Sequence, residues 1–245
     1  MLIYYSTKDI AGKNISYFLN KMKTPTHKIE IESVFVKSLP KSNAYICASR
    51  HSSKSKKKFL TFHGTGNFSS DCSVGGNAFE LGIIDANMIK NGLIFLSENI
   101  KELPYDIKME VTHHGPTHFK VPLVYAEVGS TKEEWEDLKA CELVAKSIKH
   151  VLKQKKFKQE CYVGFGGMHH AEKFTKLVLN DDLLIGHICP KYNADNLTSK
   201  MIEQMFQKTV PKPTGAIIYK KGLKGEQYRK IKELLESLNK NYIKV

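Results

Sequence analysis

Histidines recur at or just beyond the ends of apolar runs in this 245-residue chain. Four segments share the pattern of a predicted strand that ends in histidine and glycine: LTFHGTGN (60–67), EVTHHGPT (110–117), VGFGGMHH (163–170) and LLIGHICPKY (183–192). Imidazole is a neutral metal ligand or a proton carrier near pH 7, and glycine lets the backbone come close to a ligand. A folded core has no need of histidine at these places, so the pattern predicts a metal or proton-transfer site.

Glu127 adds a carboxylate at the end of another apolar run, in a position like that of the histidines. Imidazoles with one carboxylate suit Zn²⁺, which in catalytic sites takes three protein ligands and leaves one position open. The H-E-x-x-H motif is absent, so the ligands must come from distant strands, and by spacing alone each histidine is as easily structural as functional. Neighbouring side chains of an extended chain point to opposite sides, so one of His113 and His114, and one of His169 and His170, is expected to face the site.

Strands and helices alternate along the chain. Apolar runs predict strands at residues 2–5, 29–36, 44–48, 59–62, 107–112, 123–128, 162–165, 183–188, 216–219 and 242–245. Helical periodicity predicts helices at residues 11–22, 78–89, 132–152, 171–179, 197–207 and 226–238. This order predicts a single α/β domain over residues 1–245, with a mostly parallel or mixed sheet and helices on both faces. Ligands are then expected beyond the carboxyl ends of the strands.

The chain is strongly basic, because 38 lysines and arginines against 25 acidic residues give a net charge of +13. Such a charge indicates an anionic partner such as RNA, or only a surface that keeps the protein soluble. The densest positive segment is a turn between two predicted strands, which either contacts an RNA backbone or is merely solvated. It contains Arg50, Lys54, Lys56, Lys57 and Lys58.

Several classes of protein are disfavoured. No apolar run approaches the ~18 residues of a membrane span, and the first residues do not resemble a signal peptide, so a cytoplasmic protein is expected. The 5 cysteines form no C-x-x-C pair, which favours reduced and mostly buried thiols. The glycine-rich turns match neither a Walker A loop nor G-x-G-x-x-G, so a nucleoside triphosphate is not expected.

These segments resemble the archaeal and plant type of D-aminoacyl-tRNA deacylase, the zinc-dependent family. The resemblance covers nearly the whole chain, and THHGPT followed by E-x-GST-x-E-E-W is its most specific part. It runs through KDIAGKNI (8–15), ICASRHSS (46–53), HGTGN (63–67), EVTHHGPT (110–117), AEVGSTKEEW (126–135), GGMHHAEKFT (166–175), GHICPKY (186–192) and IIYKKGL (217–223). The chain departs from the family at Gly64-Thr65, Val111 and His170, where Thr-Pro, alanine and tyrosine are usual.

The resemblance implies a hydrolase that cleaves the ester between a D-amino acid and the terminal adenosine of tRNA. It also implies a fold similar to the phosphorylase and peptidyl-tRNA hydrolase group, and a requirement for Zn²⁺. On this basis the expected metal ligands, or their immediate neighbours, are His113, Glu127 and His169.

Further roles are expected from the same resemblance. His63 and His187 are the candidate proton carriers. Backbone N–H groups of Gly166 and Gly167, or of Gly115, are expected to bind the oxyanion. The RNA contacts, with the 3′ terminal adenosine and acceptor stem, are expected from Arg50, Lys54, Lys56, Lys57, Lys58, His114 and Lys191.

Alternatives stay open at this point. The chain could be a non-catalytic tRNA-binding module with structural histidines, or a phosphorylase- or peptidase-like enzyme acting on a small substrate. For the hydrolase, the attacking group is either water activated by the metal or water assisted by the ribose 2′-hydroxyl. A monomer is expected.

Overall fold

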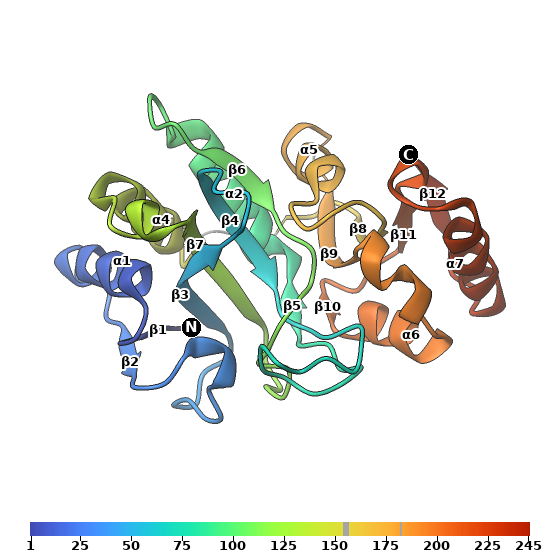
Figure 1. The fold of residues 1–245 in the computed structure, drawn as a ribbon, viewed down its shortest axis with the longest axis horizontal. Coiled ribbons are helices and arrows are strands. Elements are labelled where there is room, and N and C mark those ends of the chain that lie inside the picture. Colours follow the sequence, from blue (N-terminus) through green and yellow to red (C-terminus); the bar gives the residue numbers. More distant parts are fainter. Residues whose placement is uncertain (154–156, 182) are drawn as a thin grey trace.

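The computed structural model describes residues 1–153, 157–181 and 183–245, and within them most strands belong to two sheets that lie beside each other (Figure 1). The first sheet has the order β2-β1-β3-β7-β4-β6. Its strands β1, β2, β3 and β7 are parallel, whereas β4 and β6 run the opposite way, because β4 pairs antiparallel with β7. Their bounds are β1 Leu2–Ser6, β2 His27–Ile29, β3 Tyr45–Ser52, β4 Phe59–Gly64, β6 Asp106–Met109 and β7 Leu123–Ser130.

The second sheet is wholly parallel, with the order β12-β11-β8-β9. Its strands are β8 Cys161–Phe165, β9 Leu184–Cys189, β11 Gly215–Ile218 and β12 Tyr242–Lys244. A short parallel pair, β5 (Ile84–Asp85) and β10 (Thr209–Val210), accompanies the two sheets.

Helices cover both sheets. Helices α1, α2 and α4 pack together over one face of the first sheet, while α5 and α6–α7 lie around the second (Figure 1). The helices are α1 Ile10–Lys21, α2 Ala86–Asn99, α3 Lys132–Trp135, α4 Leu138–Val151, α5 Glu172–Asn180, α6 Ser199–Gln207 and α7 Gly225–Ser237. Short 3₁₀ turns occupy Ser33–Phe35, Lys191–Asn196 and Lys220–Gly222. No helix in these described ranges is long and apolar enough to span a membrane.

The two faces of the first sheet differ in chemistry. Even-numbered residues of its central strands enter the main hydrophobic core beneath the helices: Ile46, Ala48, Leu60, Phe62, Val124, Ala126 and Val128. Because side chains alternate along a strand, the odd-numbered residues face the other way, and many are polar yet buried: Ser49, His51, Thr61, His63 and Glu127. Buried polar groups on one face of a sheet must find partners there, so this face is where chemistry is to be sought.

The α/β class with a mixed sheet and helices is confirmed. The main core is continuous between the sheets, because Ile185 and Ile188 of β9 and Ile217 of β11 belong to the same cluster as the residues beneath α1, α2 and α4. All 5 cysteines are free thiols, and only Cys72 is not buried.

Three predicted elements are wrong. Residues 29–36 do not form a strand, because β2 ends at Ile29 and the chain then makes a 3₁₀ turn. The helix predicted at 78–89 starts only at Ala86, where Asp85 accepts a hydrogen bond from the backbone of Asn87. The helix predicted at 132–152 is broken, because Asp137 caps a new helix by accepting from two backbone N–H groups of α4. In both helices an aspartate cap overrides the apolar periodicity.

Candidate active site

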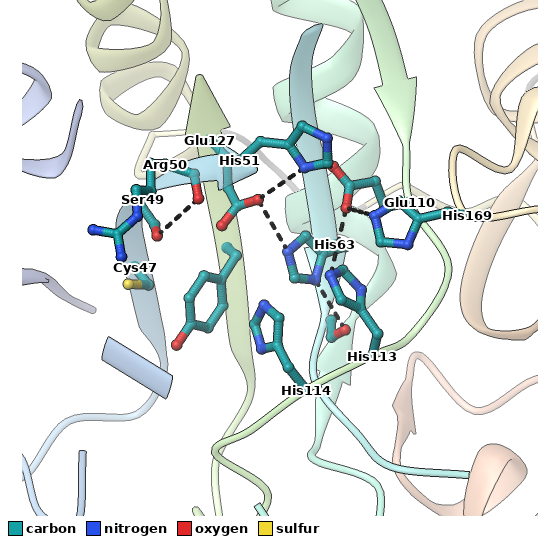
Figure 2. A network of polar contacts seen from close by, with 12 residues as sticks. Cys47, Ser49, Arg50, His51, His63, Glu110, His113, His114, Glu127 and His169 are labelled. Atoms are coloured by element: carbon teal, nitrogen blue, oxygen red, sulfur yellow. Dashed lines mark hydrogen bonds and ion pairs between the residues drawn. The ribbon is translucent and has the colours of Figure 1, made fainter. Parts of the chain in front are cut away.

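Five histidines and two carboxylates meet on the polar face of the first sheet (Figure 2). His51, His63 and Glu127 stand on three adjacent strands, β3, β4 and β7. The remaining members come from loops after β6 and β8, so both sheets contribute. The members of this histidine–carboxylate cluster are His51, His63, Glu110, His113, His114, Glu127 and His169. A sixth histidine, His170, lies beside the cluster and contacts His51.

The strand register places these residues together. Glu127 lies in the middle of β7, between Ser49 of β3 and Thr61 of β4. A close approach of β3 and β7 is needed here, because a Cβ on Gly129 would meet the carbonyl oxygen of His51. The glycine of the E-x-G-S-T motif is therefore explained by the position of His51. The cluster thus extends over the face of the first sheet, and its members from the loops after β6 and β8 lie beyond the carboxyl ends of those strands.

His51 links the two buried carboxylates. Its Nδ1 lies 3.0 Å from Glu110 Oε1 and 3.7 Å from Glu127 Oε2. Burial alone would lower the pKa of His51, but the two negative charges outweigh it and raise the pKa to about 10. Burial likewise opposes ionisation of Glu127, yet His51 and His63 hold the pKa of its carboxyl at about 2. The pKa of Glu110 also lies well below its usual value, although burial opposes this, because the charge of His51 and the contact with His169 favour the carboxylate.

Three imidazoles are oriented in the same way. The Nδ1 of His63 lies 3.1 Å from the carbonyl of Gly64, and that of His114 lies 2.7 Å from the carbonyl of Gly115. The Nδ1 of His113 similarly lies 2.9 Å from the carbonyl oxygen two residues before it. A carbonyl oxygen only accepts, so each Nδ1 carries a proton, and Nε2 is the atom of each ring that remains for a metal. Burial lowers the pKa of His63, but the nearby carboxylate of Glu127 outweighs it and raises the pKa, so this ring would release a proton on binding a metal.

The three rings lie close together. A ligand atom from each of His63, His113 and His114 lies within 4.8 Å of the others. Burial lowers the pKa of His113 well below its ordinary value and that of His114 to about 4, and the charge of nearby His63 adds to both effects. Both rings therefore stay neutral, as metal ligands must be. Backbone carbonyls that fix the tautomer of an imidazole are the usual support of metal-bound histidine.

Among the residues that the structure describes, several buried atoms of the cluster lack an adequate partner. His63 Nε2 is buried without a hydrogen bond, and the two carboxylate oxygens of Glu110 are buried with only ring nitrogens of histidine beside them. His169 Nε2 lies 2.9 Å from Glu110 Oε2, and His113 Nε2 lies 3.6 Å from the same oxygen. An unpaired buried polar atom is costly, and the Nε2 lone pair of His113 directed at the Glu110 carboxylate is repulsive. A bound cation would remove both costs, so the donor set fits a metal.

The expected combination of His113, Glu127 and His169 as ligands needs correction. The carboxylate that groups with His113 and His169 is Glu110, whereas Glu127 groups with His51 and Glu110. The reason is the register, because Glu127 is centred on β7 while Glu110 directly follows the edge strand β6.

The expectation that only one histidine of each pair faces the site is also wrong. His114 has a φ of 44°, so the chain is not extended there and both rings of the first pair enter the cluster. In the second pair, His169 contacts Glu110, and His170 Nε2 lies 3.2 Å from His51 Nε2.

A cleft of about 440 Å³ opens onto the cluster. Its walls include His51, His113, His114, Glu127 and His169. The lining also contains apolar side chains, those of Val34, Phe35 and Val74, of which Phe35 and Val74 are largely exposed. A small organic group could therefore lie against apolar side chains with its polar part at the imidazoles.

His187 lies outside the cluster. It is fully buried, with Nδ1 2.9 Å from the Thr112 hydroxyl and Nε2 3.0 Å from the carbonyl of Gly82. Burial lowers its pKa to about 3. Both ring nitrogens are occupied, which argues against the predicted role as a proton carrier and favours a structural one.

The glycines expected to bind an oxyanion have their N–H groups engaged. Gly166 donates to the carbonyl of Cys189, Gly167 to that of Gly222, and Gly115 to that of Val74. None of these three N–H groups is free to bind an oxyanion, so the structure does not favour that role.

The predicted RNA-binding residues are dispersed. Arg50 lines the cleft but pairs with Glu32 at 3.1 Å. Lys58 lies 3.3 Å from Glu133, and His114 belongs to the cluster. Lys191 lines a different cleft, while the other lysines of the β3–β4 turn are exposed: Lys54, Lys56 and Lys57.

Comparison with known proteins places this site in a family. The sequence profile of the family described as D-aminoacyl-tRNA deacylase matches residues 39–243. A curated D-aminoacyl-tRNA deacylase from Methanosarcina mazei is 39% identical over 201 residues, which cover 81% of this chain and 66% of that protein. The chain thus spans slightly less than two thirds of the length of this relative.

Other similar proteins match over nearly their full length. A curated D-aminoacyl-tRNA deacylase from Methanococcus maripaludis is 36% identical over 248 residues, which cover 96% of this chain and 95% of that protein. A crystal structure described as a conserved protein of unknown function has a TM-score of 0.92 and 26% identity, covering 99% of this chain and 94% of its own.

Proposed function

This chain belongs to the D-aminoacyl-tRNA deacylase family, and from that premise we propose that it hydrolyses the ester between a D-amino acid and the 3′ terminal adenosine of tRNA. The products are the free D-amino acid and tRNA. The proposed partner is therefore D-aminoacyl-tRNA, held by its 3′ end and acceptor stem, and the proposed location is the cytoplasm.

One observation carries the proposal beyond family membership. Three imidazoles, those of His63, His113 and His114, are held by backbone carbonyls, and one ring nitrogen of each lies within 4.8 Å of the others beside a cleft that His113 and His114 line. We infer that these three nitrogens bind Zn²⁺, because three histidines with one open position are a common catalytic zinc set. Zn²⁺ at this point would supply Lewis acidity, polarising the ester carbonyl and allowing water to attack near neutral pH.

The chain's own groups then position the substrate and move protons. Glu110 holds His169 at 2.9 Å, and His169 lines the cleft. We assign His169 to take the proton of the attacking water and to return it to the departing ribose oxygen. His51 fixes the position of Glu110, because its imidazolium is shared between the carboxylates of Glu110 and Glu127.

The test is turnover of D-tyrosyl-tRNA by the purified protein, with L-tyrosyl-tRNA as the parallel substrate. We expect release of D-tyrosine that chelation abolishes and Zn²⁺ restores. His113→Ala should be inactive, whereas His118→Ala, a matched change of an exposed histidine that hydrogen-bonds only to the backbone of Lys37, should be fully active. Salt-sensitive tRNA binding without turnover, at any zinc concentration, would instead identify a non-catalytic binding module.

A further inference from the structure

A second cleft, of about 560 Å³, is lined by four lysines. Lys173 and Lys176 come from α5, Lys191 from the turn after β9, and Lys221 from the turn after β11. We name it the lysine cleft. Three separate segments of the chain therefore bring ammonium groups to one hollow.

The charges of the lysine cleft are not neutralised. In the described ranges, none of its four ammonium groups has a carboxylate within ion-pair distance, although surface lysines elsewhere, such as Lys146, are paired. The single acidic residue of the lining, Glu172, pairs with Lys108 at 3.4 Å instead. Like charges gathered in one hollow repel each other. The attraction between a bound anion and the ammonium groups would offset this repulsion.

The lysine cleft adjoins the histidine–carboxylate cluster. His170 lines the lysine cleft, and its Nε2 lies 3.2 Å from Nε2 of His51, which lines the cluster's own cleft. A polymer whose terminal group lies at the cluster would thus pass its preceding units over His170 toward the lysines. The apolar walls beside the cluster suit the terminal group, and the lysines suit repeated negative charges.

We propose that the lysine cleft binds the phosphodiester backbone of the single-stranded 3′ end of tRNA, immediately before the terminal adenosine. This proposal rests on the proposed function and names the surface that holds the substrate. Lysine is a flexible point charge that contacts phosphate without reading bases. Such a cleft accepts the 3′ end of any tRNA, as an enzyme that acts on many charged tRNAs requires.

The experiment measures binding of uncharged tRNA at equilibrium over a series of salt concentrations. The variant is Lys173→Gln/Lys176→Gln, which removes two charges from α5. The matched control is Lys13→Gln/Lys139→Gln, which removes two exposed lysines from α1 and α4, on the left of the view and away from α5 (Figure 1). Melting temperatures of both variants confirm that each is folded.

The proposal predicts three results. The α5 variant binds tRNA about tenfold more weakly at 0.15 M salt, and the slope of log K against log salt falls by about 1.4, or ~0.7 for each phosphate contact with a single strand. The control variant binds as the unchanged protein does. Removal of the last four nucleotides of tRNA abolishes the difference between the α5 variant and the unchanged protein. Unchanged affinity and slope in the α5 variant would overturn the proposal.

A small substrate separates this proposal from the proposed function. The D-tyrosyl ester of adenosine carries no phosphodiester, so the α5 variant should hydrolyse it at the rate of the unchanged protein. Loss of that activity in the α5 variant would place the two lysines in the reaction itself and contradict the inference. If the unchanged protein binds tRNA with the predicted salt slope but hydrolyses neither ester, the proposed function fails and the lysine cleft stands.

Discussion

Replacement of His51 by glutamine tests whether a single imidazolium holds the two buried carboxylates in place. This ring lies 3.0 Å from Glu110 and 3.7 Å from Glu127. Glutamine preserves most of the volume and some hydrogen-bonding capacity but cannot carry charge. His51→Gln therefore leaves two carboxylates buried together without the cation between them.

Two separate estimates predict that His51→Gln lowers the free energy of unfolding substantially. Folding raises the pKa of His51 from 6.5 to about 10, which corresponds to about 4–5 kcal/mol of stability. Breaking a buried ion pair by removing one partner costs about 3–5 kcal/mol. Because the folded pKa is raised, this stability is fully present below pH 6.5 and is lost as the pH rises toward 10. The difference between the two proteins should therefore be largest near pH 6 and should shrink steadily above it.

The assay is urea unfolding of chelator-treated protein, followed by far-ultraviolet circular dichroism from pH 5 to pH 10. His118→Gln is the control, because His118 is exposed and its change should stay within about 0.5 kcal/mol. A His51→Gln protein that loses less than about 1 kcal/mol at pH 6, or whose deficit does not vary with pH, would refute the charge assignment.

Three further predictions concern single contacts. His187→Ala should lower the free energy of unfolding by about 3 kcal/mol, because two buried hydrogen bonds are lost. Elemental analysis should find as much bound zinc as in the unchanged protein, and loss of zinc would place His187 in the site. Gly129→Ala should cost about 2–3 kcal/mol in urea unfolding, because its methyl group meets the carbonyl of His51; a neutral result would contradict the close approach of β3 and β7. Removal of the ribose 2′-hydroxyl from the substrate should change kcat/KM by less than about tenfold if His169 takes the proton, whereas loss of most of the rate would assign that role to the ribose.

The sequence allowed the class of the fold and the neighbourhood of the site to be predicted, because both depend on local patterns. Apolar runs ending in histidine marked β4 and the loops after β6 and β8. His51 is not among the residues predicted for the site, because it directly precedes the basic turn that contains Lys54 and Lys56. Its signal was the alternation Cys47-x-Ser49-x-His51, which places polar residues on one face of a strand.

Ligand grouping could not be predicted, because it depends on strand order. Nothing local indicates that β7 lies between β3 and an antiparallel β4, which centres Glu127 between His51 and His63. Glu110 was overlooked for the same reason, although it precedes the conspicuous THHGPT segment. The left-handed backbone at His114 likewise could not be predicted, and it is the reason why strand alternation gives the wrong side for one ring of the His113–His114 pair.

Zinc binding by two alanine variants tests the central claim most directly. The account predicts that His114→Ala lowers the affinity for Zn²⁺ more than about a hundredfold, the upper range for loss of a supporting residue. It predicts that His169→Ala binds Zn²⁺ nearly as well as the unchanged protein yet no longer turns over D-tyrosyl-tRNA. The reverse pattern, with zinc lost from His169→Ala and retained by His114→Ala, would place the metal at Glu110, His113 and His169 and contradict the account.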